Sequence, residues 1–546
     1  MLGLSSVPLL AACATVAPVP RPALTPTPLP ATSTVVPTAA PVQVPTGTPA
    51  PAATATPAPS VAPTTLPTTA EVLSGFDAVV QHLMHLWAVP GLAVGIVRDG
   101  EVIYRQGFGT RNGQASAPVT PQTLFAIGSC SKAFTTLGLG ILADEQRLDW
   151  DKPIVSYLPS FKLADAFATE RMTARDLSTH RSGLPRHDLV WYSSTASRQE
   201  LVSRLQYLQP SADFRYLWQY QNMMYMTAGA LIEKISGTTW EEFTRSRILE
   251  PLGMHATTYF DAQSSRSADF ALPYGIVAGT PNQVVKPLPI QLSPAIAPAG
   301  GIVSNIDDMC RWLRLQLGYG SVDGAHVVSE QQLAQMHRPQ MVMPNDVTYA
   351  EVPPVTSYGL GWEVGVYRGH LVVSHEGEID GFNGQVTLLP ELNGGVVALS
   401  NLEVGALSLL ALNVLDRLLG LDQVPWLERG WATYAPALVA AAAQFQRDTA
   451  VNPTAPVPRP LQSYTGAFTN QGYGTLTITL QGGRLQAQLN ALTFPIVHAD
   501  ADTFKFIWLE TGNVYAATFS ATPQGSVDHV AVAFEPAVAP IPFSRS

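Results

Sequence analysis

The chain has 546 residues and a formal net charge of −10, and Lys, Arg, Asp and Glu together make up only 13% of it. A length of this order predicts two or three structural units. The sequence contains no run of Lys and Arg, so it lacks the electrostatic signature of nucleic-acid binding. We therefore expect no nucleic-acid partner.

Three cysteines are too few and too scattered for a disulfide framework or a zinc site. Cys130 and Cys310 lie in apolar helical patterns, where a free thiol packs as a small hydrophobic group. Cys13 follows Leu10-Ala11-Ala12, and this tetrad resembles a bacterial lipobox, in which the cysteine becomes the lipidated first residue. Residues 1–12 lack the positive charge that begins a signal peptide. A chance Ala-rich N-terminus is therefore the alternative to a lipoprotein signal over residues 1–13.

Residues 14–70 consist mostly of Ala, Pro, Thr and Val. Such a segment cannot build a hydrophobic core, and its prolines favour extended conformations. We expect a disordered tether that separates a globular part from a surface, which agrees with the lipobox. No later stretch reaches the ~18 apolar residues of a membrane span. The expected location is outside the cytoplasm, secreted or held at a bacterial-type cell surface by a lipid anchor alone.

Residues 71–422 predict an α+β domain. A helix is expected around Val79–Trp87, and helical patterns dominate from 123 to 252. Strands are expected on both sides of this helical stretch, at 92–97, 102–106, 371–374, 385–389 and 396–400. Tight turns are predicted at Asp99-Gly100 and Asn393-Gly394. With an amphipathic helix over 406–419, this order predicts an antiparallel sheet flanked by helices, plus a helical region.

The C-terminal part differs in composition from the rest of the globular sequence. Residues 423–460 predict a linker that is first helical, over Trp431–Gln446, and then Pro-rich. From Leu461 to Ser546 the sequence alternates in short strands separated by turn residues, at 475–480, 484–489, 504–508, 514–519 and 530–534. This spacing is typical of a small all-β barrel or sandwich.

The first motif with chemical content is Ser129-Cys130-Ser131-Lys132. Residues three positions apart on a helix share a face, so Lys132 is expected beside the Ser129 hydroxyl. The stretch 134–142 that follows is nearly all apolar or small, which indicates a buried helix. Burial disfavours the charged form of a lysine and lowers its pKa toward that of a general base. Ser129 is therefore a candidate nucleophile, although a four-residue pattern of this kind also arises by chance.

Tyr220-Gln221-Asn222 precedes the helical pattern 223–235. A tyrosine near a lysine can relay protons, and an asparagine offers a donor and an acceptor to a substrate amide. Taken alone, Tyr220 is better explained as a residue that caps or packs against this helix.

His375-Glu376-Gly377 follows the strand expected at 371–374. Gly377 would let a substrate backbone approach the strand edge. The N–H of Glu378 would be a second oxyanion donor beside that of Ser129. A single histidine on a strand is more often structural than catalytic, so this motif gains meaning only from its position after the other two.

In this order and spacing, the three motifs resemble those of the class C β-lactamase and penicillin-binding-protein family, serine hydrolases of the D-alanyl-D-alanine-peptidase clan. The stretches Met172–Pro185, Ala299–Ser304 and Tyr358–Trp362 resemble segments that members carry around these motifs. The resemblance covers about residues 71–422. Residues 461–546 resemble the lipocalin-like domain appended to some members.

The resemblance implies an acyl-enzyme on Ser129. Lys132 and Tyr220 would share the general-base work, and the N–H groups of Ser129 and Glu378 would bind the oxyanion. Asn222 would orient the substrate amide, and no metal or organic cofactor would be required.

No metal site is predicted from the remaining histidines and acids. His180, His187-Asp188 and the group His498, Asp500 and Asp502 lack the H-x-x-x-H or H-E-x-x-H spacing of a zinc site. They are better interpreted as surface polar or local hydrogen-bonding residues. The region 186–192 is expected at the rim of the pocket.

His375 stands where class C β-lactamases usually carry a lysine that faces the substrate carboxylate. A histidine is charged only in part near neutral pH, and Glu376 and Glu378 beside it would repel an anionic substrate. We therefore expect hydrolysis of D-amino-acid peptides, peptidoglycan fragments or small amides and esters ahead of β-lactams. The alternative is a catalytically idle penicillin-binding-like protein that binds cell-wall fragments. The C-terminal domain is a candidate for oligomerisation or for gating the site.

Overall fold

The computed structural model describes residues 66–113, 117–261, 264–280, 283, 285–290, 293–344, 349, 351–352, 356–450 and 455–546. The predicted signal segment with Cys13, and the predicted tether up to residue 65, lie outside this described part. None of the helices that the structure describes is both long and apolar enough to cross a bilayer.

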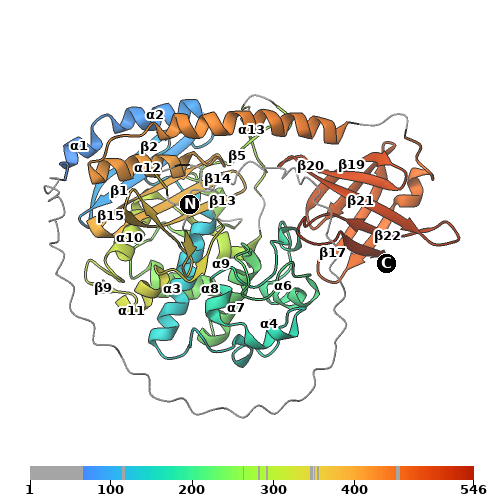
Figure 1. The fold of residues 1–546 in the computed structure, drawn as a ribbon, viewed down its shortest axis with the longest axis horizontal. Helices are drawn as coiled ribbons and strands as arrows, with labels where there is room; N and C mark the ends of the chain where they lie inside the picture. Colours follow the sequence, from blue (N-terminus) through green and yellow to red (C-terminus); the bar gives the residue numbers. More distant parts are fainter. Residues whose placement is uncertain are drawn as a thin grey trace, which may run out of the picture. The chain divides into compact units, whose positions relative to one another are not determined.

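An eight-stranded antiparallel sheet forms the centre of the first domain, and both ends of that domain contribute to it (Figure 1). The N-terminal hairpin completes the sheet because β1 pairs with β15. The strand order is β10 (Met341–Val342), β11 (Ser357–Tyr358), β12 (Glu363–Tyr367), β13 (His370–Ile379), β14 (Phe382–Leu389), β15 (Gly394–Ser400), β1 (Gly91–Arg98) and β2 (Glu101–Gly109). The predicted antiparallel sheet built from both ends of the domain is confirmed.

The two predicted turns differ in the structure. Asp99 and Gly100 have φ values of 52° and 76° and join β1 to β2 directly, as a two-residue hairpin requires. At the second turn, Gly394 already belongs to β15 and pairs with Leu389. The connection therefore takes four residues, and only Asn393, with φ of 42°, has the left-handed backbone.

Helices cover both faces of the sheet (Figure 1). One face packs against α2 (Phe76–Leu86) and α12 (Ala406–Leu419), with α13 (Trp426–Thr449) lying on α12. The other face packs against α10 (Ile306–Leu317) and faces the helical region. β14 and β15 are buried along their whole lengths. The sequence of β15 is apolar on both sides up to Leu399, whereas β14 alternates and buries Asn383, Gln385 and Thr387 on one side.

Helix α3 (Ser131–Asp144) runs through the middle of the helical region. It is surrounded by α7 (Asn222–Ser236), α9 (Ala297–Gly300) and α11 (Glu330–Met336). Every residue from Ser131 to Leu142 is buried, and Phe134 stacks on Trp312 with ring centroids 3.6 Å apart. The buried helix expected from its apolar sequence is confirmed, and it carries Lys132 into the interior.

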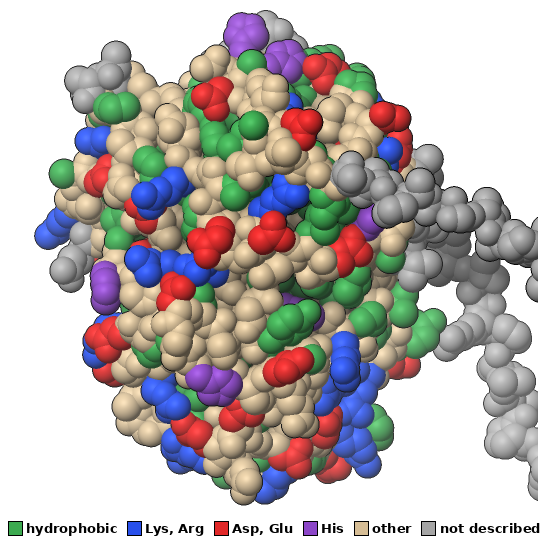
Figure 2. Space-filling model, turned by 90° about the vertical axis from the view of Figure 1, so that its left-hand side faces the viewer, with side chains coloured by type: hydrophobic (Ala, Val, Ile, Leu, Met, Phe, Trp, Pro, Cys, Tyr) green, Lys and Arg blue, Asp and Glu red, His purple; other side chains and the backbone are tan. Residues whose placement is uncertain are grey.

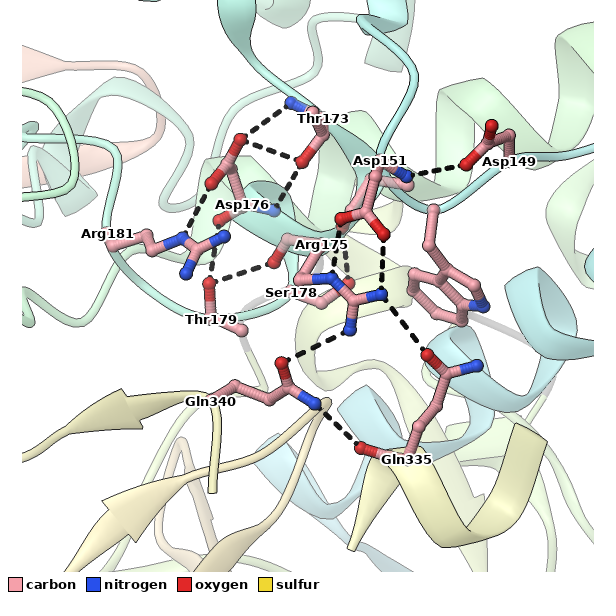
Figure 3. A network of polar contacts seen from close by, with 12 residues as sticks. Asp149, Asp151, Thr173, Arg175, Asp176, Ser178, Thr179, Arg181, Gln335 and Gln340 are labelled. Atoms are coloured by element: carbon pink, nitrogen blue, oxygen red, sulfur yellow. Dashed lines mark hydrogen bonds and ion pairs between the residues drawn. The ribbon is translucent and has the colours of Figure 1, made fainter. Parts of the chain in front are cut away.

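A buried ion network fixes the stretch that precedes the second motif (Figure 3). The Asp176 side chain is fully buried and accepts hydrogen bonds from Thr173 Oγ1 at 2.7 Å, Arg181 Nε at 2.6 Å and Arg215 Nη2 at 2.7 Å. Burial alone would raise the pKa of Asp176, but the Arg215 hydrogen bond and the Arg181 charge hold it below its usual value. Removing one member of such a network leaves an uncompensated buried charge.

The C-terminal domain is a closed antiparallel barrel of eight strands, and β16 pairs with β23 to close it. Five strands agree in position with the predicted ones: β17 (Gly474–Gln481), β18 (Arg484–Leu489), β20 (Thr503–Trp508), β21 (Asn513–Ala521) and β22 (Val527–Val532). Three were not predicted: β16 (Gly466–Asn470), β19 (Leu492–Asp500) and β23 (Ile541–Arg545). Pro495 and Pro542 interrupt the strand signal of the last two.

The surface shown in Figure 2 mixes side chains of both charges. This agrees with the scattered charge of the sequence.

Candidate active site

Ser129 lies in a short 3-10 turn, η1 (Gly128–Cys130), directly before α3. Ser129 therefore lies beside the start of the helix, and Gly128, with φ of 53°, keeps the helix from extending further toward the N-terminus. Lys132, on the first turn of α3, still reaches the serine, and its Nζ lies 2.9 Å from Ser129 Oγ. The predicted neighbourhood of Ser129 and Lys132 is thus present.

Two further acceptors surround the Lys132 amine. Nζ donates to Asn222 Oδ1 at 2.8 Å and to the Ala299 carbonyl at 2.7 Å. Neither of these oxygens can donate a hydrogen bond. A neutral amine therefore uses its two hydrogens on them and leaves its lone pair for the Ser129 hydroxyl.

The surroundings of Lys132 favour this neutral form. Lys132 has 0% of its surface exposed, and burial lowers its pKa well below the usual range. The charge of Arg186 lowers it further, while Asp188 opposes the shift. A lysine in such a site can accept a proton near neutral pH.

Tyr220 contacts the same serine from the other side. Its hydroxyl donates to Ser129 Oγ at 2.6 Å, and its ring lies 4.7 Å from Lys132 Nζ. Burial raises the pKa of the Tyr220 phenol, so the phenol is protonated and donates. Tyr220 immediately precedes the N-cap of α7, Gln221, which fixes its position in the chain.

His180 holds the Tyr220 segment in place. The His180 ring stacks on Tyr220 with centroids 4.2 Å apart. Its Nδ1 accepts the Gln221 N–H at 3.0 Å, and its carbonyl accepts the Gln219 N–H at 2.7 Å. His180 is therefore a buried, hydrogen-bonded residue and not a surface one.

Asn222 is the first residue of α7, and its side chain lies between Lys132 and Asp188. Its Nδ2 donates to Asp188 Oδ1 at 3.2 Å while its Oδ1 accepts from Lys132. Asp188 also accepts from Arg186 Nε at 2.5 Å and from Trp191 Nε1 at 2.8 Å. These contacts fix which way the Asn222 amide points.

His375 lies on β13 but does not bond the serine. Its Nε2 lies 2.7 Å from the Tyr358 hydroxyl, and its Nδ1 lies 2.6 Å from the Glu376 carbonyl. Burial lowers the pKa of His375 to about 3. The partial positive charge expected from the sequence is therefore wrong, because desolvation outweighs any attraction from the neighbouring carboxylates.

Glu376 likewise carries less charge than expected. Burial raises its pKa to about 8, although a hydrogen bond from Asn383 Nδ2 at 3.2 Å opposes the shift. The raised pKa lowers the ionised share of Glu376 near pH 7 and with it the repulsion of an anion.

The main chain of β13 approaches the serine turn closely. A Cβ added to Gly377 would lie 1.9 Å from the Ile127 carbonyl oxygen, and one added to Gly128 would lie 2.6 Å from the Glu378 backbone nitrogen. Only glycine fits at these two positions. The Glu378 backbone nitrogen thus lies close to the turn that carries Ser129.

Three contributors to this site were not predicted from the sequence as such. The Ala299 carbonyl binds Lys132, Asp188 orients Asn222, and His180 stacks on Tyr220. His180 and Ala299 belong to stretches that resemble segments of the family, and Asp188 lies in the expected rim. That membership was the only signal available for them.

The fold and the site together define an α+β hydrolase domain of the penicillin-binding-protein type. The chain belongs to the β-lactamase family, since the profile of the family described as Beta-lactamase matches residues 76–420. Residues 450–545, which include the barrel, match a domain described as of unknown function (DUF3471).

Similar proteins are known from fungi, bacteria and archaea. The unguisins hydrolase ungD' of Aspergillus campestris is 29% identical over 490 residues, which cover 85% of this chain and 90% of that protein. Protein flp of Staphylococcus aureus is 25% identical over 338 residues, covering 60% of this chain and 62% of that protein. The solved octameric penicillin-binding protein homologue of Pyrococcus abyssi shares the fold, with a TM-score of 0.55, 23% identity and coverage of 86% of this chain and 99% of that one. The family and the name of the first relative support a hydrolytic enzyme.

Proposed function

We propose that the protein is a serine hydrolase that forms an acyl-enzyme on Ser129 and cleaves amide or ester bonds in small substrates. The observation that carries the proposal is the convergence of two groups on one hydroxyl: Lys132 Nζ at 2.9 Å and Tyr220 Oη at 2.6 Å from Ser129 Oγ. A base and an acid that both touch the nucleophile are what two-step acyl transfer needs.

Acylation begins with neutral Lys132. Nζ removes the hydroxyl proton as Ser129 Oγ bonds to the substrate carbonyl carbon. The carbonyl oxygen becomes an oxyanion between the N–H groups of Ser129 and Glu378. Tyr220 then gives its phenolic proton to the leaving amine or alcohol as the scissile bond breaks, and it regains a proton from the Lys132 ammonium.

Deacylation repeats these steps with water. Lys132, neutral again, accepts a proton from water through Tyr220 while the water oxygen bonds to the acyl carbon. The second tetrahedral intermediate uses the same oxyanion donors. Its collapse releases the acid and returns a proton to Ser129 Oγ, so the site is regenerated without any group being consumed.

The substrates that we favour are D-amino-acid peptides, peptidoglycan fragments and small amides or esters. A neutral His375 provides no fixed positive charge for the carboxylate of a β-lactam. Asn222, whose amide is oriented by Asp188, is suited to bind a substrate amide. Efficient turnover of β-lactams is therefore ranked lower.

The test is intact-mass analysis of the full chain after incubation with a fluorophosphonate, a set of β-lactams, D-peptides and short esters. We expect an adduct at Ser129 with the fluorophosphonate, and faster turnover of peptides or esters than of β-lactams. Ser129→Ala is the control. Binding of muropeptides without any adduct would favour a catalytically idle binding protein instead.

We also propose that Cys13 is lipidated and holds the enzyme at a cell surface outside the cytoplasm. Support comes only from the Leu10-Ala11-Ala12-Cys13 tetrad and the Pro-rich stretch after it. Expression of the chain in a bacterium, with Cys13→Ser as control, tests this. Equal amounts of both forms in the soluble fraction would contradict it.

A further inference from the structure

The segment 187–193 has a backbone that its own residues do not favour. His187 and Ser193 have φ values of 47° and 52°, in the left-handed region that non-glycine residues rarely adopt. Such residues keep this conformation only where the surrounding structure fixes it. The contacts that fix this segment come largely from the C-terminal barrel.

Two barrel residues hold the start of the segment. The His187 backbone N–H donates to Glu535 Oε2 at 2.9 Å, and His187 Nδ1 lies 2.7 Å from the Tyr473 hydroxyl. His187 Nε2 lies 2.9 Å from the Gln209 carbonyl, which can only accept, so Nε2 carries the hydrogen and Nδ1 accepts from Tyr473. Tyr473 and Glu535 are 1% and 7% exposed, so water does not compete well for these bonds.

Other barrel residues hold the rest of the segment. Asn490 Nδ2 donates to the carbonyls of Leu189 and Tyr192, each at 3.1 Å. The Ala491 N–H donates to the Ser193 carbonyl at 3.2 Å, and Trp508 packs edge-on against Tyr192 with centroids 5.0 Å apart. The segment is thus held by the barrel along its whole length.

The same segment reaches the active site at two points. Asp188 accepts from Asn222 Nδ2, and Asn222 in turn contacts Lys132. The Tyr192 hydroxyl bonds the carboxylate of Asp380, the residue that follows β13. The segment therefore bridges the helical side of the site and the end of the strand that carries Glu378.

We propose that the barrel is a positioning element of the active site: Tyr473 and Glu535, acting through His187, hold Asp188 and thereby Asn222 in the geometry that binds the substrate amide. This rests on the proposed function and gives the domain of unknown function a role in substrate binding. Neither barrel residue touches the substrate. Their loss misplaces a binding group and leaves Ser129, Lys132 and Tyr220 in contact with one another.

The test uses the full chain with both Tyr473→Phe and Glu535→Met, which remove the two hydrogen-bonding groups at similar size, and Tyr464→Phe as a matched control. The Tyr464 hydroxyl donates to Asp502 Oδ1 at 2.6 Å inside the barrel, so this control removes the same kind of group away from the segment. Hydrogen–deuterium exchange of residues 187–193 and steady-state kinetics on a peptide or amide substrate are measured. Reaction of Ser129 with a small fluorophosphonate is measured in parallel.

We expect faster exchange of residues 187–193 and a rise in KM of about tenfold with little change in kcat, as for loss of a positioning group. Labelling by the fluorophosphonate stays near that of the parent. If the double variant does not fold, Asn490→Ala releases the other end of the segment and is judged by the same readouts.

Unchanged exchange and KM would overturn the proposal, and so would equal changes in the Tyr464→Phe control. Faster exchange without a change in KM would show that the barrel holds the segment but not the binding geometry, which also overturns it. If Ser129 is unreactive even in the parent chain, the proposed function fails. Unchanged exchange in the double variant would then separately overturn the inference that the barrel holds residues 187–193 in place.

Discussion

The helical side and the strand side of the site use their residues differently. On the helical side, the side chains of Lys132 and Tyr220 both bond Ser129 Oγ. On β13, the His375 side chain bonds Tyr358 and the strand's own backbone, while the main chain at Gly377 approaches the serine turn. On the helical side, removing a side chain should therefore impair proton transfer to and from Ser129. On β13, adding a side chain should instead disturb the packing of the strand against the serine turn.

The largest effect is expected from Lys132→Met, which keeps the length of the side chain and removes the base. The ratio kcat/KM should fall by about 10²- to 10⁴-fold, as for loss of a general base. The midpoint of thermal unfolding should not show a loss comparable to that of kcat/KM, because an apolar group replaces the buried amine. Activity within about tenfold of the parent would mean that another group takes the proton.

Gly377→Ala tests the strand side. Its Cβ would lie 1.9 Å from the Ile127 carbonyl, so β13 or the serine turn must move. We expect acylation to slow by about 10²-fold, the effect of a misplacement of about 1 Å, and unfolding to become easier by roughly 1–3 kcal/mol. The measurements are burst kinetics and denaturant unfolding.

Gly365→Ala on the neighbouring strand β12 is the matched control, since its Cβ would meet only Thr356 Cγ2 at 3.4 Å. Equal effects of the two alanine substitutions would show that the close approach of β13 to the serine turn is unimportant.

The smallest effect is expected from His375→Asn, measured as a pH profile of kcat/KM. Below the lowered pKa of Lys132 the amine is protonated and its lone pair is blocked, so activity falls as pH falls through that value. His375, with a pKa of about 3, stays neutral over the working range and adds no inflection there. The variant should keep the position of the acid limb and lose less than about tenfold in rate, as for one hydrogen bond. If the fall in activity at low pH occurs at a different pH in the variant, then His375 and not Lys132 is the group that titrates.

Much of this arrangement could be predicted from the sequence where the cause is local. The pairing of Ser129 with Lys132 follows from helix geometry, and the burial of Lys132 follows from the apolar residues after it. The sheet could be predicted from the strand patterns at both ends of the domain. Five barrel strands could be predicted from the alternation of apolar and polar residues along them.

What could not be predicted depends on tertiary packing. The Ala299 carbonyl has no side-chain signal, and Asp188 faces Asn222 only because distant segments are brought together. The partial charge expected for His375 was wrong because the sequence shows the residue type and its ordinary pKa, whereas desolvation by the folded chain is not visible in it.

The central claim is that acyl transfer passes through Ser129. Intact-mass analysis during turnover of a slow ester substrate, followed by peptide mapping, tests it most directly. We expect a single acyl adduct on the peptide that contains Ser129 in the parent chain, and neither adduct nor turnover in Ser129→Ala. An adduct on another residue, or hydrolysis that persists in Ser129→Ala, would contradict it.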